Sequence, residues 1–323
     1  MKGSNEIVSD TSNNESHGTA IAFLLFGVAG ALGLDLCAKW LLADYSLQQF
    51  IFLRSIFGLL IFLSISRWYG GLGSLKTTRP VAHIVRTVLA TGAMFGFFYG
   101  LKFMPLVSAL TLAFTAPLMV TVLSVPLLRE RVGWRRWLAV VVGFLGVLIV
   151  LRPGAGLLTP AAIGILVAAA CYAGLAISAR MLAATESTLS LAVYVIKGPL
   201  LASLIMLPGN ISAPTISGWV FFVLAGFASA CAWIGIIGGY RRAPPSLLAP
   251  FEYTALIGAA IAGYFIWGEV PDKWVICGGA VIIGSGLFIV HREVGRVIAG
   301  RYIRAFTAGS SAAIARRFGK NRS

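Results

Sequence analysis

Stretches of about 20 apolar residues alternate with short polar connections along most of this chain. An α-helix of about 20 apolar residues crosses the hydrocarbon core of a bilayer. The connections are too short to hold an inserted soluble domain. The pattern therefore predicts ten membrane-spanning helices, at 18–41, 46–66, 80–101, 105–127, 134–151, 159–182, 189–208, 217–239, 245–267 and 273–290.

One part of this pattern occurs twice. The stretch 105–153 holds two apolar segments around a short charged hinge, and the design returns later in the chain, where Pro244 corresponds to Pro105 and Glu269 to the hinge acid Glu130. Such self-similarity predicts a duplicated chain, and duplication in a membrane protein is typical of transporters. Because each half would hold an odd number of spans, the second half should enter the membrane upside down, as an inverted repeat.

The expected organisation has four parts. Residues 1–17 are polar and lack the basic start of a signal peptide, so we expect a disordered cytoplasmic tail. Two five-helix halves should follow, at 18–153 and 159–291, and residues 292–323 should form a basic cytoplasmic tail. The predicted fold class is an all-α membrane protein.

Composition and charge agree with this class. The chain is 58% hydrophobic and 11% charged, whereas a soluble domain carries about 25% charged residues. With a cytoplasmic N-terminus, 19 basic residues lie on the inner side and three on the outer side. This asymmetry follows the positive-inside rule and places both termini in the cytoplasm. It also accounts for the net charge of +15 with a lipid bilayer, and without a nucleic-acid partner.

Three charged residues lie in the outer parts of the first two predicted spans. Asp35 and Lys39 are four positions apart and share a helix face, and Arg54 lies where it could pair with Asp35. Ionisable groups at membrane depth usually face the interior of the bundle. Substrate binding or gating is one interpretation of this cluster, and a structural ion pair or a side chain reaching the interface is the other.

Two further charged residues lie deep in the second half. Lys197 precedes Gly198-Pro199, and Glu252 follows Pro250, so proline-freed backbone could line a cavity beside both. We expect the two side chains to pair across that cavity, with Glu252 as a candidate carrier of a coupling proton. A purely structural pair is the alternative. Arg86, near the start of the third span, is interpreted as an interface anchor.

Aromatic residues are numerous, and a minority could stack on a planar substrate. The candidates are Tyr99, Phe114, Trp233 and Tyr253, while lipid contact or packing explains most of the others. No catalytic motif, Walker loop or metal-ligand spacing occurs, so we expect no enzyme activity, metal or cofactor. The four cysteines, Cys37, Cys171, Cys231 and Cys277, all fall inside apolar segments.

Several motifs together resemble a known family. The Glu-Arg-Val hinge at 130–132 with Trp134, the Arg-Pro-Gly at 152–154 and the Gly-Glu at 268–269 are similar to the drug/metabolite transporter superfamily, in its EamA-type branch. This resemblance covers about 18–293. Asp35 with Lys39, and the segments Phe52–Ser55 and Ala93–Tyr99, resemble a sub-group that includes riboflavin and S-adenosylmethionine importers.

The resemblance implies a carrier of the bacterial inner membrane with two EamA-like repeats around a central cavity. Riboflavin uptake is the most specific expectation, resting on the resemblance and the supply of aromatic residues. Uptake of S-adenosylmethionine and efflux of amino acids or drugs remain open, as do the direction of transport and its coupling to protons. A membrane-embedded enzyme would need convergent histidine or acidic ligands, and the three histidines do not supply them.

Overall fold

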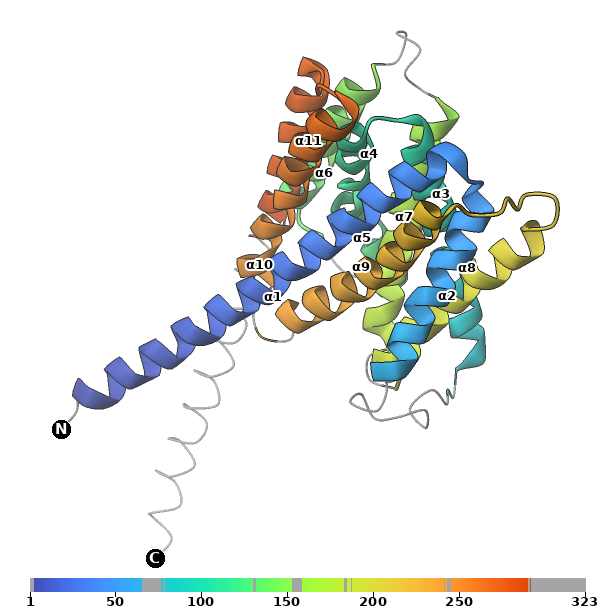
Figure 1. The fold of residues 1–323 in the computed structure, drawn as a ribbon. Coiled ribbons are helices and arrows are strands. Elements are labelled where there is room, and N and C mark those ends of the chain that lie inside the picture. Colours follow the sequence, from blue (N-terminus) through green and yellow to red (C-terminus); the bar gives the residue numbers. More distant parts are fainter. Residues whose placement is uncertain are drawn as a thin grey trace, which may run out of the picture.

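The computed structural model describes residues 3–65, 77, 79–129, 132–152, 159–182, 185–186, 188–240, 242, 245–289 and 291. Within these ranges the regular structure is helical throughout (Figure 1). The helices are α1 (Gly3–Asp44), α2 (Leu47–Ile65), α3 (Pro80–Phe103), α4 (Leu106–Ala113), α5 (Ala116–Leu128), α6 (Trp134–Leu151), α7 (Pro160–Leu182), α8 (Thr188–Met206), α9 (Ile216–Tyr240), α10 (Pro245–Glu252), α11 (Thr254–Trp267) and a last helix, Lys273–Ile289.

The helices have the length and the surface that a membrane requires. Large apolar side chains such as Ile216 and Phe265 lie exposed on the outside of the bundle, with 87% and 79% of their surface accessible. Lipid can cover such a surface and water cannot do so cheaply, so the chain is a multi-pass membrane protein. Among the described residues, six helical segments are long and apolar enough to cross a bilayer, namely Gly18–Asp44, Pro80–Phe103, Leu106–Leu128 (α4 with α5), Trp134–Leu151, Pro160–Ala179 and Ile216–Tyr240. Shorter apolar helices lie at Leu47–Ile61, Val193–Met206 and Lys273–Ile289.

Two of the predicted spans are each divided into two helices. The sequence predicted a single helix at 105–127 and another at 245–267. In the structure α4 and α5 are separated at Phe114 and Thr115, and α10 and α11 are separated at Tyr253. Pro117 lies in the first turn of α5, where it has no N–H to offer to the carbonyl group four residues earlier, so the helix breaks there.

The two halves pack through equivalent contacts. In the sequence, Gly96 of α3 corresponds to Gly235 of α9, and both approach a partner backbone closely. A Cβ atom on Gly96 would lie 2.5 Å from the carbonyl oxygen of Gly164 in α7, and one on Gly235 would lie 2.6 Å from that of Phe23 in α1. Phe23 and Gly164 occupy equivalent positions of α1 and α7. The same crossing is therefore built twice, once as α3 on α7 and once as α9 on α1.

Other helix pairs also occur twice, once in each equivalent combination of the two halves. α2 packs on α9 as α8 packs on α3, and α1 packs on α11 as α7 packs on α5. Figure 1 shows α1 and α9 side by side, with α2 and α8 next to them. The helix bounds agree, because α2 and α8 begin and end at equivalent positions. The duplication proposed from the sequence is thus visible in the packing.

Four sequence expectations concern the ends and connections of the chain. The expected disordered tail at 1–17 differs from the structure, in which α1 begins at Gly3 and extends away from the bundle (Figure 1). No proline or glycine interrupts the segment between Gly3 and Gly18, so the helix can propagate backwards from its buried part. The basic tail at 292–323, the hinge residues 130–131 and the Pro-Gly at 153–154 lie outside the described residues.

Candidate functional site

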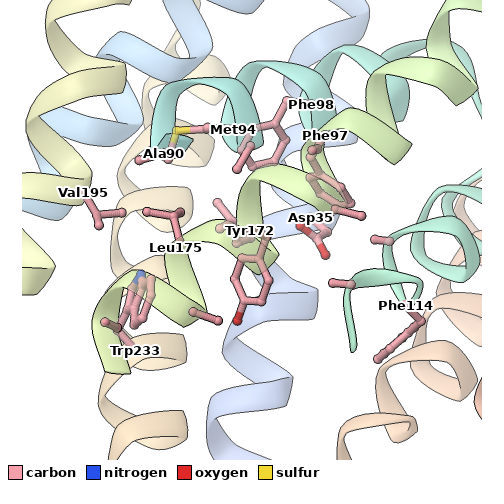
Figure 2. A pocket seen from close by; sticks show the side chains of 18 of the residues that line it. Asp35, Ala90, Met94, Phe97, Phe98, Phe114, Tyr172, Leu175, Val195 and Trp233 are labelled. Atoms are coloured by element: carbon pink, nitrogen blue, oxygen red, sulfur yellow. The ribbon is translucent and has the colours of Figure 1, made fainter. Parts of the chain in front are cut away.

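A cavity of about 630 Å³ lies between the two halves, and in the described part of the chain its lining comes from α1 to α5 and α7 to α10. Its size is within the usual range of about 300–1,000 Å³ for small-molecule sites. Most of the lining is apolar. Its aromatic members are Phe97, Phe98, Phe114, Tyr172 and Trp233, and Figure 2 shows the labelled side chains around a common space.

The cavity lining itself follows the duplication. Helix register makes Leu34 of α1 equivalent to Leu175 of α7, and both line the cavity. Both halves therefore contribute equivalent residues to the cavity lining. Further lining pairs at equivalent positions are Asp35 with Ala176, Arg54 with Val195, Met94 with Trp233, Phe98 with Ile237, and Ala113 with Glu252.

Asp35 and Arg54 bring opposite charges to this cavity. Both are buried, with 8% and 7% of their surface accessible. Nη2 of Arg54 donates to Oγ of Ser229 at 2.9 Å, and Nη1 lies 2.8 Å from Sδ of Met94. The charges of Arg54 and Asp35 act on each other through space, but the described part of the chain holds no hydrogen bond or salt bridge to Asp35.

Arg86 is the cavity residue that the sequence interpretation placed elsewhere. It was expected to anchor α3 at the interface, yet only 4% of its surface is accessible and it lines the cavity. Nη1 donates to the carbonyl oxygen of Leu175 at 2.9 Å and to Oγ of Ser178 at 2.7 Å, both in α7. Nη2 lies 3.5 Å from the carbonyl oxygen of Leu191 in α8. Arg86 thus fastens α3 to the second half beside the cavity.

Glu252 lines the cavity at the end of α10, but it does not pair with Lys197 as expected. Its Oε1 accepts a hydrogen bond of 2.6 Å from the hydroxyl group of Tyr240 in α9. Lys197 is exposed on α8, and its Nζ lies 4.6 Å from the centre of the Tyr194 ring. The position of Lys197 in the sequence indicated its depth in the membrane, but not the side of the helix on which its side chain lies.

The remaining candidates lie beside the cavity or away from it. The ring of Tyr253 contacts that of the lining residue Phe114, with centroids 4.9 Å apart. Tyr99 is 38% exposed and contacts the ring of Phe103, at a centroid distance of 5.1 Å. Of the nine candidates, the cavity thus brings together Asp35, Arg54, Phe114, Trp233 and Glu252.

Lys39 belongs to a separate cluster that joins three parts of the chain. Its Nζ forms a salt bridge with Oε1 of Glu269 and donates to the carbonyl oxygen of Met104 at 3.2 Å. Oε2 of Glu269 accepts from the backbone N–H of Leu106 at 2.9 Å, at the start of α4. We name Lys39, Met104, Leu106 and Glu269 the clasp. It ties the end of α1 to the α3–α4 turn and to the segment after α11.

Known proteins share the duplication that is seen in the helices and in the cavity lining. The family model for the EamA-like transporter family matches twice, at residues 18–152 and 159–291. This chain belongs to the EamA-like transporter family.

Relatives of this EamA-like chain include named transporters. It is 30% identical over 279 residues to the S-adenosylmethionine uptake transporter of Rickettsia felis, covering 85% of this chain and 93% of that protein. It is 28% identical over 228 residues to the riboflavin transporter of Rhizobium johnstonii, covering 70% and 75%. A solved crystal structure shares the fold at a TM-score of 0.59 and 20% identity, covering 86% and 98%.

Proposed function

We propose that this protein is a secondary transporter that moves S-adenosylmethionine, or a closely similar metabolite, into a bacterial cell by alternating access. The observation that carries the proposal is the cavity between the two repeats, lined at equivalent positions by both. In a carrier of this kind the two halves rock around a central site and expose it to each side in turn. The small-molecule transporters among the relatives support the same general function.

The arrangement in the membrane is part of this proposal. We infer ten spans, five in each of the halves 18–153 and 159–291, with the second half inverted and both termini cytoplasmic. The strong bias of basic residues toward one side supports the orientation. The exchange of helix partners between the halves supports a two-fold relation between them. The bacterial relatives support an inner-membrane location.

The charges in the cavity favour S-adenosylmethionine as the substrate. This molecule carries a positive sulfonium, an amino-acid group with both charges and a planar adenine ring. The cavity offers two carboxylates, Asp35 and Glu252, two guanidinium groups, Arg54 and Arg86, and several aromatic rings. Phe114 and Trp233 are the lining rings that we propose for stacking on adenine.

Riboflavin is the second candidate, and the aromatic lining is the observation that favours it. A flavin ring would stack on Phe114, Tyr172 or Trp233 as well as adenine would. Riboflavin is uncharged at neutral pH, however, and offers no charge to the buried carboxylate and guanidinium groups of the cavity. Efflux of amino acids or drugs would use the same architecture in the other direction.

Uptake by vesicles that contain the purified full-length protein tests the proposal. Labelled S-adenosylmethionine should enter in a saturable manner, above empty vesicles, and unlabelled S-adenosylmethionine should compete more strongly than riboflavin. Saturable entry of riboflavin with no competition by S-adenosylmethionine would replace the first substrate by the second. No saturable entry of either compound, in either membrane orientation, would refute transport of both.

A further inference from the structure

The carboxylate of Asp35 is a buried charge with no direct partner in the described structure. It is 8% accessible and lines the cavity, and Figure 2 shows it at the central space. A carboxylate in a membrane interior is costly unless another charge or hydrogen-bond donor satisfies it. The other three charged lining residues have such contacts. Arg54 binds Ser229, Arg86 binds Leu175 and Ser178, and Glu252 binds Tyr240.

Arg54 does not take the place of a direct partner. Its two terminal nitrogen atoms contact Ser229 of α9 and Met94 of α3, and its guanidinium group lies 5.6 Å from the centre of the Phe98 ring. These contacts hold it to the wall of the cavity. Its charge acts on Asp35 through space, while the oxygen atoms of Asp35 stay available to a third group.

The duplicated scaffold provides an internal comparison for Asp35. The equivalent position of α7 is Ala176, which also lines the cavity. Arg54 likewise corresponds to Val195, and Glu252 corresponds to Ala113. The same helix architecture is therefore built in the other half with small or branched apolar residues at these places. Packing does not require a charge there, so the charge has another use.

We propose that Asp35 binds a positively charged group of the transported molecule, an ammonium or a sulfonium cation. The inference rests on the proposed function for the act of transport, and it adds the charge that the substrate must carry. A cation entering the cavity would satisfy the buried carboxylate directly. The ring faces of Tyr172 and Trp233 in the same lining would also favour a cation. Asp35 thus selects charged molecules over neutral ones of the same shape.

The test compares a charged and a neutral ligand on the purified full-length protein. S-adenosylmethionine carries the cation, and 5′-methylthioadenosine keeps the adenosine and the sulfur atom but is neutral. Binding is measured from the ligand-induced rise in unfolding temperature. Asp35→Asn should weaken the binding of S-adenosylmethionine about tenfold to about a hundredfold, as expected for a lost charged contact, and change that of 5′-methylthioadenosine less than about twofold. Asp35→Glu should retain part of the preference.

Two further measurements separate this role from a structural one. Without ligand, Asp35→Asn should change the unfolding temperature little, because the relief of burying a carboxylate and the loss of its through-space attraction to Arg54 oppose each other. The matched control is Asp44→Asn, the same change at an exposed position of α1, which should alter neither stability nor binding. An unfolding temperature of Asp35→Asn far below that of the wild type, or equal losses of affinity for both ligands, would overturn the proposal.

Failure of the inference and failure of the proposed function give different results. Charge-selective binding that Asp35→Asn abolishes, with no uptake by vesicles, would keep the inference and refute transport of S-adenosylmethionine. Normal uptake of S-adenosylmethionine by the Asp35→Asn variant, at unchanged affinity, would refute the inference and keep the function. Stabilisation by riboflavin alone, equal in wild type and variant, would refute both.

Discussion

The side-chain rings of Phe114 and Tyr253 are in contact, with their centroids 4.9 Å apart and their planes tilted by 40°. Phe114 separates α4 from α5, and Tyr253 separates α10 from α11, at equivalent positions of the two repeats. The two helix breaks therefore meet, and Phe114 also lines the cavity. This contact joins the two halves at the point where each has a break between two helices.

Replacing these rings should reveal a direct energetic coupling. Phe114→Leu and Tyr253→Leu should each destabilise the protein, and the double variant should lose less than the sum, by about 1 kcal/mol, because an aromatic pair contributes about 0.5–1.5 kcal/mol beyond its buried area. Thermal unfolding of the four proteins measures this. Tyr253→Phe keeps the ring and should preserve the coupling, and strictly additive losses would argue against it.

The clasp should contribute to stability through the salt bridge of Lys39 with Glu269. Both side chains are mostly buried, at 11% and 20% accessibility, so Glu269→Gln should lower the unfolding free energy by about 1–3 kcal/mol. The control is Asp272→Asn, which breaks the exposed salt bridge to Arg152 and should have little effect on stability. Equal effects of the two substitutions would show that the clasp adds nothing beyond a surface ion pair.

The close crossing of α3 and α7 predicts a strict requirement for glycine. Gly96→Ala would place a Cβ atom 2.5 Å from the carbonyl oxygen of Gly164, so the helices must separate at a cost of about 1–3 kcal/mol. Gly58→Ala in α2 is the matched control, since its Cβ atom would meet nothing within 4 Å. The yield and unfolding temperature of both variants check this, and equal behaviour would contradict the tight crossing.

Glu252 provides the test of proton coupling. The prediction is that an imposed proton gradient accelerates uptake in the wild type and not in Glu252→Gln, which cannot bind and release a proton. Tyr240→Phe removes the hydroxyl donor that holds Glu252 but keeps the carboxylate, so the response to the gradient should persist. A response of Glu252→Gln equal to that of the wild type would exclude this residue as the proton carrier.

The sequence predicted the helices and the duplication well, because both depend on local patterns. Apolar length placed the helix ends, and the match of Pro105 to Pro244 and Glu130 to Glu269 revealed the repeat. The charged residues Asp35 and Arg54 reached the cavity for the stated reason, since a charge in a membrane segment turns toward the bundle interior.

The direction in which a charged side chain points, and the residue that it contacts, were harder to predict than its depth in the membrane. Lys197 lies within α8, yet it points outward and rests on the Tyr194 ring, where its long side chain can reach an interface. Lys39 shares a helix face with Asp35, but the facing segment that supplies Glu269 lies far away in sequence. Arg86 was taken for an anchor because its acceptors, two backbone carbonyl groups and the hydroxyl group of Ser178, belong to other helices, and no sequence pattern displays such contacts.

α1 carries both the cavity acid and one side of the clasp. Asp35 and Lys39 are four residues apart in one uninterrupted helix, which corresponds to about 6 Å along its axis. A rigid helix transmits displacement over such a distance almost without loss. If the clasp opens by movement of α1, the carboxylate of Asp35 in the cavity moves with it. Binding in the cavity and opening of the clasp are therefore coupled through α1.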